Sequence, residues 1–99
     1  MDPEMAELHR RARDFVTLER YAELLAHVVH FGQDRLQELL PRFGLSPEQW
    51  SVIDAAWMHE LAEGKRRQQH EQGARFNLTF TKTRQRLATT QPPMASIRG

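Results

Sequence analysis

The sequence contains no cysteine, which excludes a disulfide framework, a zinc site built on thiolates and a catalytic cysteine. It also contains no run of about 18 apolar residues, so we expect no segment that spans a membrane and no membrane partner. The opening residues Met1-Asp2-Pro3-Glu4 are acidic, whereas a secretory signal begins with basic residues. We therefore expect a cytoplasmic protein.

Glycine and serine are scarce, and their positions argue against an active site. The five glycines stand apart at turn positions, so no loop is expected to wrap around a phosphate group. The only serines are Ser46, Ser51 and Ser96, and none follows a strand in the manner of a hydrolase nucleophile. We expect a protein that is not an enzyme and has no cofactor.

Charge of either sign is present, but it is divided along the chain. The 99 residues suit a single domain, and 14 basic and 13 acidic side chains give a net charge of only +1. Residues 1–64 carry six of the basic and twelve of the acidic side chains, whereas residues 65–99 carry eight basic side chains and one acidic one. An acidic body is thus followed by a basic C-terminal arm.

Apolar residues at helical spacing predict four helices in the first two thirds of the chain. The clearest helix start is Ser46-Pro47-Glu48-Gln49, where serine caps the helix, proline takes the first position and Gln49 completes a capping box. Leu45 and Trp50, on either side of it, form a hydrophobic staple. Pro41 should break the preceding segment into a short helical run and a single turn that ends at Gly44. The predicted helices cover 3–15, 18–31, 34–43 and 47–63, with Asp2, Thr17, Asp34 and Ser46 as caps and Gly32, Gly44 and Gly64 as stops.

The predicted core is centred on the pair of helices 18–31 and 47–63. The helix 3–15 should carry a narrow apolar stripe, Met5, Leu8, Ala12 and Phe15, and leave His9 in solvent with its charged neighbours. Phe15 lies outside the unit 17–64, where a small domain has least capacity to bury it. The main core should consist of Leu18, Tyr21, Leu25, Val28, Leu36, Leu39, Leu40, Trp50, Ile53, Trp57 and Leu61.

Residues 65–87 allow two interpretations. Phe76, Phe80, Thr83 and Leu87 have helical spacing, but residues 75–81 also alternate as a half-buried strand would. We favour a helix, with Gly73 as a weak point, because no other strand is predicted and a lone strand would need to pair with another chain. The predicted fold is all-α, a small bundle of four to five helices, divided into an N-terminal amphipathic helix (1–16), a core helical domain (17–64), the basic arm (65–87) and a disordered tail (88–99).

Histidines raise the possibility of a metal site, which the spacing does not support. Glu23, His27 and His30 share one helical face but lack a further ligand, so we expect the two histidines to form local contacts. The segment 59–63, His-Glu-Leu-Ala-Glu, differs from the zinc-protease pattern because Glu63 stands at the position of the second histidine. We predict no metal ion.

The basic arm is the predicted contact surface, because arginines beside aromatic side chains are common in binding sites. Nucleic acid is the alternative partner of residues 65–86. A helix-turn-helix reader is disfavoured because the helix 47–63 is acidic. We expect an adaptor or assembly module that binds a protein partner or a second copy of itself, through Arg75, Phe76, Phe80, Lys82, Arg84 and Arg86.

The segments Thr17–Ala26 and Arg42–Trp50, followed by Trp57, resemble short helical accessory modules of bacterial proteins of the kind associated with contractile (type VI-like) secretion systems. The resemblance covers residues 17–64 and rests on capping and core residues. It implies a small helical adaptor and points to no functional residue.

Overall fold

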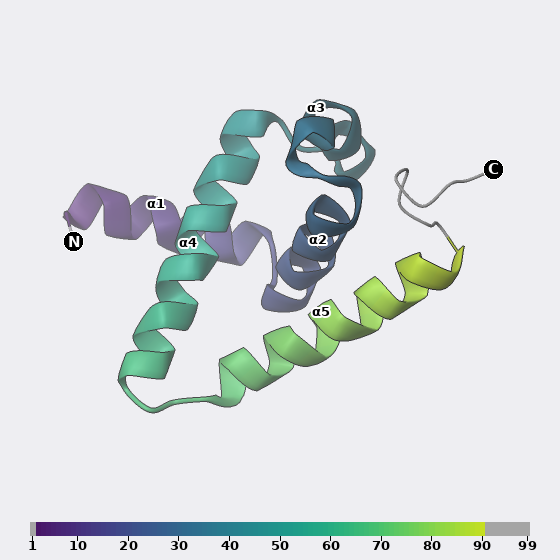
Figure 1. The fold of residues 1–99 in the computed structure, drawn as a ribbon. Helices are drawn as coiled ribbons and strands as arrows, with labels where there is room; N and C mark the ends of the chain where they lie inside the picture. Colours follow the sequence, from purple (N-terminus) through teal and green to yellow (C-terminus); the bar gives the residue numbers. More distant parts are fainter. Residues whose placement is uncertain (1, 91–99) are drawn as a thin grey trace.

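The computed structural model describes residues 2–90, and within this range it is all-helical, with no strand. Five α-helices follow one another between residues 2 and 90 (Figure 1). The prediction of an all-α bundle is confirmed, and the helical interpretation of the basic arm is correct. The elements are α1 (Pro3–Phe15), α2 (Leu18–Phe31), the 3-10 helix η1 (Gln33–Arg35), α3 (Leu36–Leu39), the 3-10 helix η2 (Leu40–Phe43), α4 (Pro47–Arg66) and α5 (Glu71–Thr90).

Local side-chain caps define where the long helices begin. The carboxylate of Asp2 accepts a hydrogen bond from the Glu4 amide at 3.1 Å, and the Thr17 hydroxyl accepts one from the Arg20 amide at 3.2 Å. At α4 the predicted capping box is complete, because Ser46 and Gln49 exchange hydrogen bonds. These bonds satisfy amides that would otherwise have no partner in the first turn of each helix.

Asp34 is not a cap, contrary to the prediction. It lies inside η1, and neither η1 nor α3 begins with a side-chain hydrogen bond. Gly32, with φ of 99°, turns the chain directly from α2 into η1, which leaves no extended residue where Asp34 could act as a cap. The expected break at Pro41 is present, since α3 is followed by η2 and then by Gly44 in the left-handed conformation.

Helix α4 passes through Gly64 and ends at Arg66, three residues beyond the predicted end. The amide of Gln69 donates to the Gly64 carbonyl at 2.7 Å, and the amide of Gln68 donates to the Lys65 carbonyl at 3.0 Å. This is the Schellman arrangement, and Gln68 occupies its left-handed position with φ of 62°. A side chain on Gly64 would meet the Gln69 carbonyl at 3.2 Å, so this glycine permits the close return of the chain and does not stop the helix.

Helix α5 is longer than predicted at its C-terminal end. Residues 88–90 belong to it, although they were assigned to a disordered tail, and Gly73 lies within its first turn. A helix that already packs on the core can extend past its last buried residue, Leu87, at little cost. The remainder of the predicted tail, 91–99, lies outside the described residues.

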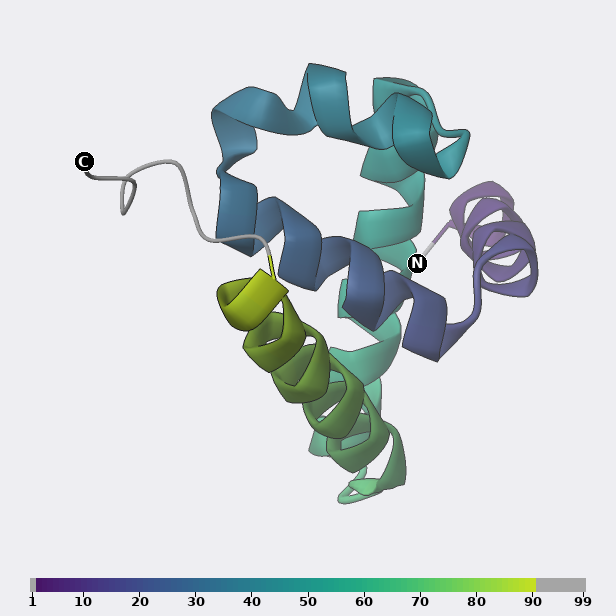
Figure 2. The ribbon, with the colours of Figure 1, turned by 90° about the vertical axis from the view of Figure 1, so that its right-hand side faces the viewer.

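The helices pair differently from the prediction. The most extensive contacts are those of α5 along α2 and of α1 across α4, and α2 and α4 touch over a smaller area (Figures 1 and 2). Tyr21 nevertheless joins α2 to α4, because its ring stacks on Trp50 and its hydroxyl donates to the Asp54 carboxylate at 2.6 Å. Most of the predicted core is buried, but Leu25, Leu36 and Leu61 are only partly buried, while the core also takes Ala12, Val16, Leu24, Leu45, Ala56 and Leu87.

The contact face of α1 was predicted wrongly. His9, expected in solvent, is only 7% exposed, and it is buried together with Ala12 and Val16. Phe15, which lies outside the predicted core unit 17–64, is 68% exposed. The buried face is rotated because Val16 lies in the core and the Trp57 indole donates to the Val16 carbonyl at 2.8 Å, which fixes how α1 enters the domain. None of the helices within residues 2–90 has the length and apolar character of a membrane span.

Candidate interaction surfaces

The aromatic residues of the basic arm are turned towards the domain. The Phe76 ring lies 5.8 Å from the Tyr21 ring and packs partly buried against the core. The half-buried Phe80 ring stacks on Phe76 at 5.5 Å. Further along the same face, Thr83 and Leu87 are buried. The structure therefore places Phe76 where it supports the α2–α5 contact, and Phe80 at the edge of that contact.

The basic residues of the arm have diverse surroundings. Arg75 forms an ion pair with Glu19 of α2 through two hydrogen bonds of 2.8 and 2.9 Å. The pKa of Glu19 is lowered mainly by this hydrogen bond. The guanidinium of Arg84 lies 5.9 Å from the centre of the Phe80 ring, a cation–π distance. Lys82 and Arg86 are exposed on α5, so three predicted residues, Lys82, Arg84 and Arg86, present charge at the surface.

A second surface, of which the sequence indicated only Phe15, lies between α1 and α4. Leu8 and Phe15 of α1 face Val52 and Ile53 of α4 across an open groove of about 340 Å³. Its lining is almost entirely apolar, and Arg11, Glu48 and Gln49 supply the polar atoms at its edge. Leu8 is 43% exposed and Phe15 is the most exposed of the large apolar side chains described. The groove is therefore an uncovered apolar surface with a projecting aromatic side chain.

A signal for this groove is present in the sequence of α1. His9, Ala12 and Val16 have the spacing i, i+3 and i+7, which is as compatible with a buried stripe as the spacing of Met5, Leu8, Ala12 and Phe15. Two overlapping stripes on one short helix mean that one of them must remain outside when the other is buried. Because His9 was treated as a polar residue, the second stripe was not recognised as a candidate for burial.

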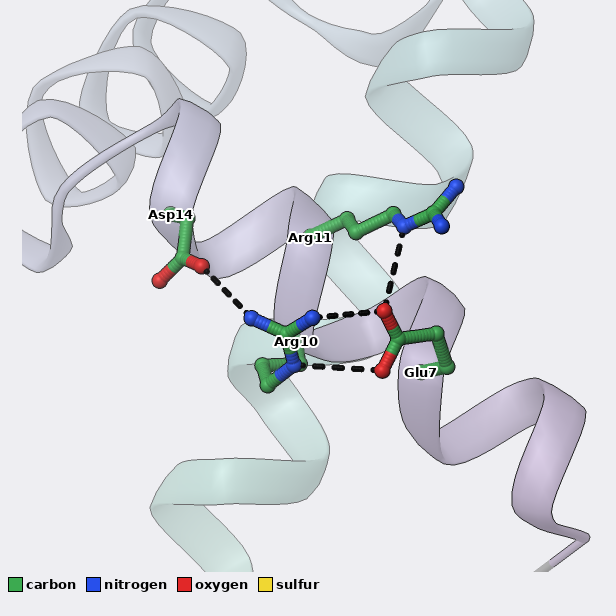
Figure 3. Close-up of polar contacts among 4 residues, drawn as sticks. All are labelled: Glu7, Arg10, Arg11 and Asp14. Atoms are coloured by element: carbon green, nitrogen blue, oxygen red, sulfur yellow. Dashed lines mark hydrogen bonds and ion pairs between the residues drawn. The ribbon is translucent and has the colours of Figure 1, made fainter.

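Charged side chains form a network along the outer side of α1 (Figure 3). The guanidinium of Arg10 bonds to Glu7 and, at 3.1 Å, to Asp14, and Arg11 reaches the same Glu7 carboxylate at 3.2 Å. The hydrogen bond from Arg10 is the main reason that the pKa of Glu7 is lowered. All four side chains are exposed, so each pair adds little stability and can exchange partners at small cost.

Histidine side chains do not assemble a metal centre in the described part of the chain. Residues 2–90 contain no group of three histidine, aspartate or glutamate side chains placed to hold a metal ion. His27 bonds the Glu23 carbonyl through Nδ1 at 2.7 Å, and the ring of the buried His30 packs against Phe31. The buried His9 faces His59 of α4, with ring centroids 6.0 Å apart, and its Nδ1 has no hydrogen-bond partner.

No protein-family model, curated protein or solved structure matches this chain. The expected likeness to bacterial accessory modules stays a prediction, and the function must be inferred from the surfaces described above.

Proposed function

We propose that this chain is a helical adaptor or assembly module without catalytic activity, and that it binds protein through the groove between α1 and α4. The observation that supports the proposal is the exposure of Phe15 and Leu8 beside the apolar flank of α4. Exposed aromatic and aliphatic side chains grouped around a hollow are typical of protein-binding sites, in which a few buried anchors supply most of the affinity.

The groove is better suited to a protein helix than to a small substrate. It is open along its length, and its polar atoms are confined to the edge, so it offers no converging set of polar groups that would orient a reacting molecule. Ser46, directly before α4, is engaged in the cap of that helix. An amphipathic helix could lay its apolar face in such a groove.

In this proposal the basic arm contributes to the partner surface only at its outer side. Phe76 and Arg75 already have partners in α2, so they support the domain. Phe80, at the edge of the α2–α5 contact, and the exposed side chains of Lys82, Arg84 and Arg86 form the charged rim that we assign to an acidic partner. Such a rim would accelerate association more than it would raise affinity.

Nucleic acid remains the alternative partner. Several arginines of the arm form ion pairs within the chain, which makes phosphate binding less favoured than the sequence indicated. Arg66 and Arg67 contact Glu63, and Arg75 contacts Glu19. A gel-shift assay across a salt series separates the two classes, because phosphate binding weakens steeply as salt rises. We expect no shift of DNA or RNA even at about 50 mM salt, where phosphate contacts are strongest. A shift that fades with added salt would favour the alternative.

The proposal can be tested by photo-crosslinking inside the cells that produce the protein. A photoreactive phenylalanine analogue at Phe15 should form a covalent adduct with a protein, because this side chain would lie in the interface. The matched control is the same analogue at Leu78, which is 58% exposed on α5 away from the groove. No adduct from position 15, or equal adducts from both positions, would contradict the proposal.

A further inference from the structure

The groove between α1 and α4 has features that identify its occupant. We propose that it binds the α1 helix of a second copy of this chain, with the two α1 helices antiparallel across a two-fold axis. This inference rests on the proposed function, because it names the partner of the same surface. It is argued from the charge order along α1 and from the shape of the exposed stripe.

The first argument is charge complementarity. The N-terminal half of α1 carries Glu4 and Glu7, following Asp2 at the cap, and the C-terminal half carries Arg10, Arg11 and Arg13, with Asp14 as the exception. Two parallel copies would bring like charges together, whereas two antiparallel copies bring the acidic half of each helix beside the basic half of the other. Opposite charges across an interface fix orientation and register more than they add affinity.

The charge order along α1 also sets the register of the antiparallel pair. The change from acidic to basic falls between Glu7 and Arg10, so the two-fold axis should pass close to Leu8. Side chains on a helix lean towards its N-terminus, so Phe15 of one copy would reach towards Met5 of the other. Met5 is 44% exposed and is therefore available for this contact. The antiparallel pair would cover the whole exposed stripe of both copies.

The second argument is that the surface is self-complementary. Each copy offers a projecting side chain, Phe15, and an apolar hollow flanked by Val52 and Ile53. In a two-fold dimer the same patch serves both subunits, so one surface must provide both the projection and the hollow. Arg11 lines the hollow, and its exposed pair with Glu7 can be exchanged for a pair across the interface (Figure 3).

The experiment begins with the purified full chain studied by sedimentation equilibrium over a concentration series. We expect a monomer–dimer equilibrium in the wild-type chain. Phe15→Glu should raise the dissociation constant at least tenfold, about 1.4 kcal/mol, because it places a carboxylate in the apolar contact. Leu78→Glu is the matched control, a change at another exposed apolar residue, on α5, and it should leave the equilibrium unchanged. Circular dichroism checks that both variants keep the helical fold.

Orientation can be tested by disulfide trapping, since the chain has no cysteine of its own. Glu4 and Arg11 lie on the same flank of the stripe, two turns apart, and each should lie beside the other residue in the antiparallel pair. A mixture of Glu4→Cys and Arg11→Cys chains should therefore form a mixed disulfide faster than either chain forms a disulfide with itself. Leu8→Cys, near the axis, should form one with itself.

Each result bears on the inference separately from the proposed function. A wild-type chain that is monomeric at about 1 mM, or that dimerises equally well as Phe15→Glu, would overturn the second copy as occupant. Faster self-trapping of Glu4→Cys would overturn the antiparallel arrangement. If the chain is monomeric but the analogue at Phe15 still forms an adduct with another protein in cells, the inference fails and the proposed function stands.

Discussion

At the scale of single residues, buried polar groups hold the helices of this domain in place. The Tyr21 hydroxyl and the Asp54 carboxylate bond each other between α2 and α4, and the Trp57 indole bonds the Val16 carbonyl between α4 and the end of α1. Burial is the main reason that the pKa of Tyr21 is raised, so the phenol stays protonated and acts only as a donor. These bonds specify geometry that apolar packing alone would leave open.

Tyr21→Phe tests the first of these bonds. The ring and its stacking on Trp50 remain, but Asp54 loses its donor, so we expect a loss of about 1.5 kcal/mol in the free energy of unfolding. Urea denaturation measures the change. Asp54→Asn keeps an acceptor oxygen and should cost less. A Tyr21→Phe variant as stable as the wild type would show that the bond contributes nothing net.

Gln68→Gly tests the turn between α4 and α5. Gln68 has a left-handed backbone, which costs a residue with a side chain about 1 kcal/mol and costs glycine nothing. The greater entropy of glycine in the unfolded chain offsets part of this gain, so we expect a net stabilisation of about 0.5 kcal/mol, seen as a higher melting temperature. The neighbouring change Gln69→Gly should not stabilise, and a lower melting temperature for Gln68→Gly would contradict the assignment.

At the scale of helices, α5 serves as part of the core as well as a charged surface. Thr83 and Leu87 are buried, and Phe76 packs on Tyr21. Arg75 ties its N-terminal part to Glu19 of α2. The basic character of this segment suggested an arm that binds another molecule, but its apolar stripe packs against α2 of the same chain.

The ion pair between α5 and α2 should make a small, pH-dependent contribution to stability. Because the pKa of Glu19 is lowered in the folded chain from its ordinary value of 4.5, the contribution is present above that pH and is lost as the pH falls through the folded-state pKa. Arg75→Ala should therefore lower the melting temperature slightly at pH 7 and not at about pH 3. Lys82→Ala is the control, and an Arg75→Ala deficit that persists in acid would indicate lost packing.

At the scale of the molecule, the fold is thin, with principal extents of 52, 29 and 17 Å. A backbone thickness of 17 Å corresponds to no more than about two layers of packed helices, so each helix has few neighbours to cover it. Exposure of Phe15 and Leu8 follows, because α1 contacts α4 along one side only. A domain of this size has little interior, and an uncovered stripe is the natural place for a partner.

Deletion of α5 should disrupt the domain. If the basic arm served only to bind a partner, removing residues 65–99 would leave 17–64 helical and abolish only association. Since α5 covers α2, we now expect a truncated chain that loses cooperative unfolding in urea and much of its helical signal. A matched variant, Lys82→Glu with Arg84→Glu, keeps α5 and should remain folded. A truncated chain that still unfolds cooperatively would show that the rest of the domain folds without α5.

The sequence determined where α1, α2 and α4 begin, how the segment around Pro41 breaks and that the fold of residues 2–90 is all-α. Caps such as Ser46 with Gln49 act between residues three apart, so their signal is complete in the local sequence. The end of α4 was harder to predict from the sequence, because the closing turn depends on Gln68 adopting a left-handed conformation that glycine usually takes.

Only the tertiary structure decided which side of α1 is buried and which helix α5 covers. Two stripes on α1 satisfy the same periodicity, and the choice depends on Val16 and Trp57, which lie 41 residues apart in the chain. Likewise the place of Phe76 depends on Tyr21, which no local pattern reveals. Periodicity indicates that a helix has an apolar side, but burial requires a second surface that packs against that side. The candidate groove exists because one stripe of α1 packs against α4 and the other stripe is not covered within residues 2–90.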